Sequence, residues 1–130
     1  MKKLVILFAI ALMTISTYAE KNPVASLEGA KKEKTVKNLL LALKSDNTGL
    51  QSSAAYYLGE MESTEAVLPL MTILNSNNNE GSRVMAALSL VKIGDERGIQ
   101  LVRYYSNNDS SSYVKRMCTI FIENFENNKF

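Results

Sequence analysis

Histidine and tryptophan are both absent from this 130-residue sequence, and cysteine occurs once, at Cys118. The lack of histidine excludes histidine-ligated zinc sites, histidine general bases and the Ser/His or Cys/His pairs of nucleophilic enzymes. A single cysteine excludes an internal disulfide, so the fold must be stable on its core alone. We therefore expect no catalytic residues, no cofactor and no metal site, and the chain is predicted not to be an enzyme.

The N-terminus has the pattern of a secretory signal peptide. Residues 1–19 combine a positively charged start with an almost unbroken apolar run over 4–15 and small residues at Thr17 and Ala19, the two positions that a signal peptidase reads. An uncleaved membrane anchor is the alternative, but the apolar run is shorter than the ~20 residues needed to span a bilayer. We predict cleavage and a periplasmic or secreted protein.

A strongly basic surface is absent from the predicted mature chain. Removal of residues 1–19 takes away Lys2 and Lys3 and leaves 13 basic and 13 acidic side chains. Such a chain lacks the basic stripe that follows a phosphate backbone. Nucleic acid is therefore not expected as a partner, and neither is a membrane after cleavage.

The remainder is predicted to form one repeat domain behind a short leading segment. Residues 20–34 are charged and weakly patterned, and we expect a frayed segment or a short capping helix that starts at Pro23. From residue 35 apolar residues recur at the three-and-four spacing of a helix face. The repeat domain is therefore assigned to residues 35–130.

Within that domain a helix pair recurs at an offset of 31 or 32 in the numbering. First helices are predicted from residue 35, over 65–74, and around Ile99 and Val102, and a second helix is predicted over 50–61. Two second helices carry paired alanines, Ala54-Ala55 and Ala86-Ala87, and Met117-Cys118 takes the aligned place in the third unit. The difference of one between the two offsets is assigned to the loop 75–81. Such self-similarity predicts an all-α fold, an α-solenoid of about three helix pairs.

These motifs resemble the HEAT-like repeats of bacterial proteins, often called the phycocyanobilin-lyase type. The resemblance is carried by AAYYLG at residues 54–59, EAVLPL at 65–70, and the Ile93-Gly94-Asp95 turn, and it covers about residues 35–126. It implies the solenoid fold. It implies little about activity, because the motif positions are those of packing, although some proteins of that type are bilin lyases.

The repeat alignment also assigns a role to Cys118. It occupies the slot of Ala55 and Ala87, which are small residues on the packed side of the second helix. We therefore interpret it as a buried thiol that acts as a small hydrophobe. The degenerate third unit is interpreted as a terminal cap with a polar outer face.

The exposed side of the second helices is the candidate binding surface. Leu50 and Tyr57 are predicted on the packed side and Tyr56 on the solvent side. The predicted register gives three exposed rows: Ser52, Val84 and Lys115; Tyr56, Leu88 and Thr119; Glu60, Lys92 and Glu123.

The third row alternates in sign and is interpreted as a ladder of surface ion pairs. The second row is apolar, and exposed apolar patches mark interaction sites. The alternative, that Val84, Leu88 and Val91 pack against a neighbouring helix, stays open at this point. The candidate partner-binding residues are Tyr56, Glu60, Val84, Leu88, Lys92 and Thr119.

The sequence thus predicts an exported, non-catalytic scaffold that binds a protein or peptide on its second helices. Two other readings remain. The chain is a subunit of an enzyme related to the HEAT-type lyases, or it is a structural module that associates with itself.

Overall fold

Six α-helices and one short 3-10 helix make up the part of the chain that the structure describes. The structure is a computed structural model, and it describes residues 23–128. The chain divides into two units, Met1–Thr35 and Val36–Phe130. The predicted signal peptide, residues 1–19, lies outside the described residues.

Helix α2 (Pro23–Ala42) begins at the proline that the sequence predicted as a helix start. Proline suits this position because the first helical N–H has no partner within the helix. Gly29 does not interrupt the helix, and further along the hydroxyl of Thr35 donates a 2.9 Å hydrogen bond to the carbonyl of Lys31. Residues 23–34 therefore belong to one long helix, rather than to the short helix or frayed segment that was expected.

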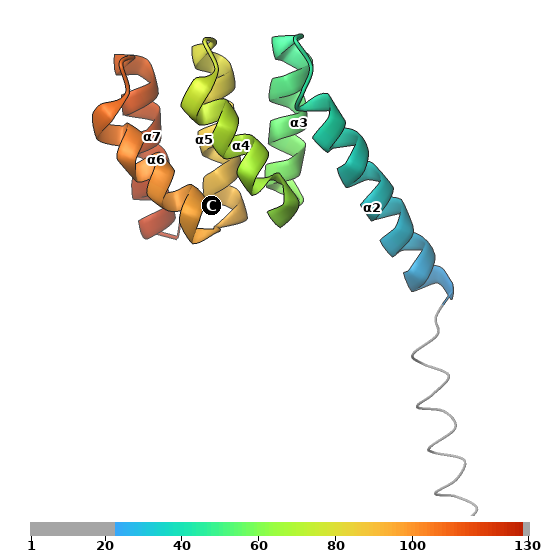
Figure 1. Cartoon of the computed structure of the whole chain (residues 1–130). Helices are drawn as coiled ribbons and strands as arrows, with labels where there is room; N and C mark the ends of the chain where they lie inside the picture. The colour runs from blue at the N-terminus through green and yellow to red at the C-terminus, as the bar shows by residue number, and fades with distance from the viewer. Residues whose placement is uncertain (1–22, 129–130) are drawn as a thin grey trace, which may run out of the picture. The chain divides into compact units, whose positions relative to one another are not determined.

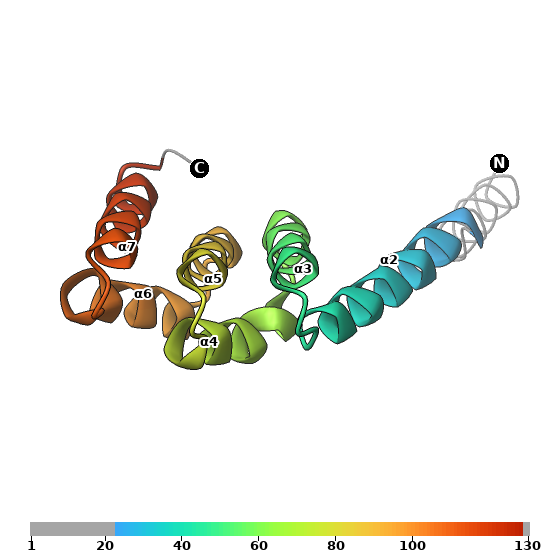
Figure 2. The ribbon, with the colours of Figure 1, turned by 90° about the horizontal axis from the view of Figure 1, so that it is seen from above.

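The second unit stacks its helices in two layers. It continues from the last turns of α2 with α3 (Thr48–Glu60), η1 (Thr64–Ala66), α4 (Val67–Ser76), α5 (Glu80–Ile93), α6 (Glu96–Asn108) and α7 (Ser112–Glu126). Helices α3, α5 and α7 pack in one layer, and α4 and α6 form the other (Figures 1 and 2). Because α4 packs on α5 and α6 on α7, the repeating element is a helix pair. The predicted all-α solenoid is confirmed.

Helices α3, α5 and α7 all start with the same capping arrangement. The N-cap residues are Asn47, Asn79 and Ser111, at a constant spacing of 32 in the numbering. Their side chains accept hydrogen bonds of 3.0, 2.9 and 3.3 Å from backbone N–H groups in the first turn of the helix that follows. Such a cap satisfies one of the N–H groups that a helix leaves unpaired at its start. The caps therefore mark equivalent positions in the three units.

The residues two positions before these caps repeat as well. The side chains of Ser45, Asn77 and Asp109 each accept a hydrogen bond from the backbone N–H of the cap residue that follows. The offset from one unit to the next is thus the same across both loops. The predicted shift in the loop 75–81 is wrong.

This constant spacing corrects the register of the third unit by one residue. Cys118 is equivalent to Ala54 and Ala86, not to Ala55 and Ala87, and it is fully buried as expected. Ile120, not Thr119, joins the row of Tyr56 and Leu88. The register error arose from matching small residues instead of capping residues.

Close approach of α3 and α5 explains the small residues of the second helices. Ala54, Ala55, Ala86 and Ala87 are all buried. The hydroxyl of Ser89 lies 2.7 Å from the carbonyl oxygen of Ala55 on the neighbouring helix. A Cβ on Gly59 would lie 2.9 Å from Cα of Ser89, so only glycine fits there without a shift of the two helices.

The turns between the helices differ in how the next helix is capped. Gly94 ends α5 in the left-handed conformation with φ 74°, and the Asp95 side chain caps α6 by accepting from the N–H of Arg97. Glycine and aspartate are residue types that suit these two positions. Before α4, by contrast, the chain forms a short 3-10 helix, and its N-cap residue Ser63 makes no capping hydrogen bond through its side chain.

Candidate functional site

The corrected register gives one apolar row along the second helices, which we call the second-helix row: Tyr56 on α3, Leu88 on α5 and Ile120 on α7. Tyr56 and Ile120 are each 39% exposed, and Leu88 is half-buried. The row therefore presents apolar surface in each of the three units, one repeat apart. The sequence had placed Tyr56 and Leu88 in this row but missed Ile120.

A charged cluster borders the row between α3 and α5. Lys92 forms an ion pair with Glu60, and its Nζ lies 5.3 Å from the centroid of the Tyr56 ring. Both interactions restrain Lys92, and a cation over an aromatic face is attractive. The Tyr56 ring also meets the ring of Tyr57 edge-on, with centroids 5.5 Å apart. Tyr56 is thus held on two sides while part of its surface remains open.

The predicted ladder of ion pairs is only half present. Among the described residues Lys92 pairs with Glu60 and forms no ion pair with Glu123. The corrected register gives the reason, because Asn124 is the residue equivalent to Glu60 and Lys92. Glu123 belongs instead to the row of Gly59.

Two of the three residues whose exposure was left open, Val84 and Val91, are covered. Val84 is 9% exposed and Val91 is 1% exposed, because α5 is the middle second helix and packs against α3, α4, α6 and α7. Thr119 is half-buried, and its hydroxyl donates to the carbonyl of Lys115. The packing alternative therefore holds for Val84 and Val91.

Two residues predicted for the packed side are exposed instead. Leu50 is 51% exposed and Tyr57 is 56% exposed. Their equivalents in α5, Ser82 and Ser89, are buried. The periodicity placed them on the side of the helix that packs in later units, but it carried no information on whether a neighbour covers that side of α3.

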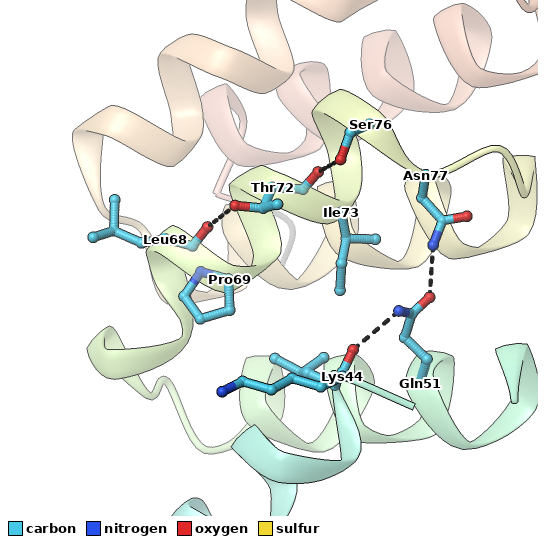
Figure 3. A pocket seen from close by; sticks show the side chains of 9 residues that line it. Lys44, Gln51, Leu68, Pro69, Thr72, Ile73, Ser76 and Asn77 are labelled. Carbon is cyan, nitrogen blue, oxygen red and sulfur yellow. Dashed lines mark hydrogen bonds between the residues drawn. The ribbon is translucent and has the colours of Figure 1, made fainter. Parts of the chain in front are cut away.

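A pocket of about 550 Å³ lies beside α4 and is shown in Figure 3. Nine residues line it: Leu43, Lys44, Gln51, Leu68, Pro69, Thr72, Ile73, Ser76 and Asn77. They come from the turn after α2, from α3 and from α4. The lining offers apolar side chains and one cation, Lys44.

Polar groups of this pocket already have partners within the protein. The amide nitrogen of Gln51 donates to the carbonyl of Leu43 at 3.0 Å, and the amide nitrogen of Asn77 donates to Oε1 of Gln51 at 2.8 Å (Figure 3). The hydroxyls of Thr72 and Ser76 donate to carbonyls of their own helix. The pocket is therefore suited to apolar contact more than to recognition of a polar ligand.

The contact between Gln51 and Asn77 recurs one unit later as an ion pair. Arg83 and Asp109 are equivalent to Gln51 and Asn77, and the Arg83 guanidinium lies 2.9 Å from the Asp109 carboxylate. The arginine side chain also donates to the carbonyl of Asn77 at 3.2 Å. With side-chain exposures of 15% and 3%, this pair is internal and joins consecutive units.

The described residues contain no group of three or more histidine, cysteine or acidic side chains that is placed to hold a metal ion. Burial raises the pKa of the Cys118 thiol to about 12, with a further contribution from the carboxylate of Asp109. A thiol in that state is not a nucleophile at neutral pH. The interpretation of Cys118 as a packing residue is thus supported by its surroundings.

This chain is similar to a known protein family and to a known enzyme. A family model described as HEAT repeats matches residues 24–121. A curated relative, the deoxyhypusine hydroxylase of Debaryomyces hansenii, is 31% identical over 91 residues. The alignment covers 69% of this chain and 29% of the relative, so this chain spans less than a third of the relative's length.

The relative corrects one prediction directly. We expected the chain not to be an enzyme, and the similarity to a protein named as a hydroxylase contradicts that expectation. Reasoning from the missing histidine concerned only histidine-based sites and did not reach other kinds of enzyme.

Among the helices within residues 23–128, none is long and apolar enough to cross a membrane.

Proposed function

Because the chain belongs to the HEAT-repeat family, we propose that it is a helical-repeat scaffold that binds a protein or peptide segment along its second-helix row. The observation that carries this proposal is the alignment of Tyr56, Leu88 and Ile120 across three consecutive units. Regular spacing of apolar side chains suits an extended or helical segment that contacts each unit in turn.

The chemistry of the row fits such a role. A partly exposed tyrosine contributes large contact area and is a frequent binding hot spot, worth about 2 kcal/mol or more when well packed. Lys92 and Glu60 lie at the edge of the row, where charged groups favour one orientation of a partner over another. Lys92 also lines a hollow of about 180 Å³ with Val91, Phe125 and Asn128.

Site-specific photo-crosslinking tests this proposal. A crosslinking amino acid at Tyr56 or Ile120 should capture the same partner in the native cell. The same probe at Tyr104, which is 57% exposed on α6 of the other layer, should not. Tyr56→Ala and Ile120→Ala should each weaken binding of that partner about tenfold or more while the thermal unfolding transition stays in place. Capture from Tyr104 alone, or unchanged affinity in both variants, would refute it.

A second candidate is that the chain serves within an enzyme related to the hydroxylase that it resembles, as a subunit or as the whole catalyst. The similarity over 69% of the chain favours it. The test is to incubate the purified chain, alone and with its captured partner, with a protein that carries deoxyhypusine. Gain of one oxygen atom by the substrate, seen by mass spectrometry, supports this candidate, and no gain under either condition removes it.

We also propose that the chain is exported and that residues 1–19 are removed. The apolar run and the small residues before Glu20 support this. The intact mass of protein recovered from the cell envelope or medium should correspond to a chain that begins at Glu20. A full-length mass, or recovery only from the cytoplasm, would contradict it.

Kinship with the phycocyanobilin-lyase type of repeat likewise remains a proposal, supported by the motifs at residues 54–59 and 65–70. A chromophore that copurifies with the native protein would support an association of that kind. A colourless protein after purification from a bilin-producing host would count against it.

A further inference from the structure

The side of α3 that faces away from α5 carries three exposed residues, Leu50, Ser53 and Tyr57, and we call it the open face. The opposite side of α3 carries Ala55 and Gly59, which meet Ser89 of α5. Tyr57 lies two residues from each of these and so points to the other side of the helix. Leu50 and Tyr57 are two turns apart and form one apolar stripe.

Repeat equivalence shows that this side of a second helix is normally buried. The equivalents of Leu50 and Tyr57 are Ser82 and Ser89 in α5, and Val114 and Phe121 in α7. These four side chains are all buried, whereas Leu50 and Tyr57 are 51% and 56% exposed. The exposed pair is also larger and more apolar than its α5 counterpart. Within residues 23–128, no second helix therefore lies against this inter-repeat side of α3.

The other end of the array differs in chemistry. The residues of α7 equivalent to Ala55 and Gly59 are Thr119 and Glu123, and Arg116 is exposed near them. Arg103 of α6 and Glu126 of α7 form an ion pair at this end, 2.6 Å apart. These side chains make this side of α7 polar. A head-to-tail contact would bury its charges against the apolar open face, at a large desolvation cost.

We propose that the chain forms a symmetric dimer through the open face, with α3 of one copy antiparallel to α3 of a second copy. A twofold axis beside Ser53 brings Leu50 of each copy against Tyr57 of the other, as an isologous interface requires. Ser53 is small and exposed, and it permits close approach of the two helices at the axis.

Charge supports a second copy as the occupant. Glu60 is the one charged residue within α3, and it is already paired with Lys92. Two open faces therefore meet without like-charge repulsion along the helix. This interface is on a different side of α3 from Tyr56 of the second-helix row, so the dimer does not depend on the proposed function.

Sedimentation of the full chain over a concentration series tests the dimer. The wild-type chain should shift from monomer to dimer as concentration rises. Leu50→Glu and Tyr57→Glu should each raise the dissociation constant at least about tenfold, because each buries a carboxylate in an apolar contact. Both positions are exposed in the monomer, so its thermal unfolding should be nearly unchanged. The matched control Tyr104→Glu should leave the dimer intact.

Disulfide trapping tests the antiparallel arrangement. Ser53→Cys should form a covalent dimer under mild oxidation, and Asn107→Cys, at the end of α6, should not. Cys118 does not interfere because it is fully buried. A monomer at every concentration, a dimer unaffected by both glutamate variants, or trapping only at Asn107 would overturn the proposal, as would assemblies larger than two. Occupation of the open face by a different protein while the chain stays monomeric would do the same.

Discussion

Replacement of Gly59 by alanine should destabilise the protein, although alanine is the better helix former. The added Cβ would lie 2.9 Å from Cα of Ser89 and 3.0 Å from its Cβ and Oγ. Because the nearest of these atoms is backbone, a side-chain rotation cannot relieve the contact. Helices α3 and α5, which pack together more extensively than any other pair of the described helices, would have to move apart.

The expected size of the effect follows from three terms. Alanine gains about 1 kcal/mol over glycine in helix propensity. Overpacking of a well-packed contact costs about 1–3 kcal/mol. Loss or distortion of the hydrogen bond between Ser89 and the carbonyl of Ala55 costs about 1 kcal/mol more. The steric terms exceed the propensity gain, so Gly59→Ala should lower the free energy of unfolding by about 1–3 kcal/mol.

Urea denaturation followed by far-ultraviolet circular dichroism measures this change. Gly29→Ala is the matched control, since a Cβ there meets nothing within 4 Å and the residue also lies inside a helix. It should leave the stability of the repeat array unchanged or higher. The double variant Gly59→Ala, Ser89→Ala should lose less than the sum of the two single losses, because part of the clash has gone. A Gly59→Ala variant as stable as the wild type would show that the α3–α5 distance is not set at this residue.

Four further substitutions probe the core. Ser82→Ala should be neutral or stabilising in urea denaturation, because the buried Ser82 hydroxyl has no hydrogen-bond partner among the described residues, while Ser89→Ala should cost about 1 kcal/mol. Asp109→Ala should cost about 3 kcal/mol or more, since it leaves the guanidinium of Arg83 buried without its partner; a loss below half of that in the same assay would show that the pair is solvated. For Cys118 the folded pKa of about 12 exceeds the ordinary value of 9.0, so the unfolded chain loses its proton first and stability should fall as pH rises between those values. Cys118→Ala should remove that part of the pH dependence, and an identical slope in both proteins would contradict the assignment.

Much of the fold follows from local signals that the sequence states clearly. The paired alanines predict close helix packing, and Gly94 with Asp95 marks a helix end and the next helix start. Pro23 marks the beginning of α2. In each case one residue type satisfies one backbone or steric requirement, so tertiary structure is not needed to read it.

The errors arise where tertiary structure decides. Tyr57 and Leu50 have the spacing of packed residues, and whether they are covered depends on a neighbouring helix rather than on α3 itself. For Val84 the error is the opposite one, since it was predicted to be exposed and is buried. Helix α5 lies in the middle of the array, so its neighbours cover a side that would be exposed at an end. Helical periodicity identifies faces but does not identify which faces have neighbours.

The register of the third unit was available from the sequence through a different signal. Asn47, Asn79 and Ser111 are all good N-cap residues at a constant spacing, and aligning them places Ile120 in the second-helix row. Small residues are a poorer guide, since alanine, cysteine and threonine all occur at close helix contacts.

The polar ion pair of Arg103 and Glu126 at one end of the array limits how such a protein can grow. A unit appended after α7 would meet charged side chains and gain little buried apolar area. Duplication of the segment from Asn77 to Asn108, inserted between existing units, would instead bring its own apolar sides and its own capping residues. Lengthening of this chain, by evolution or by design, is therefore expected to take place elsewhere than beside α7 and to leave its last helix pair unchanged.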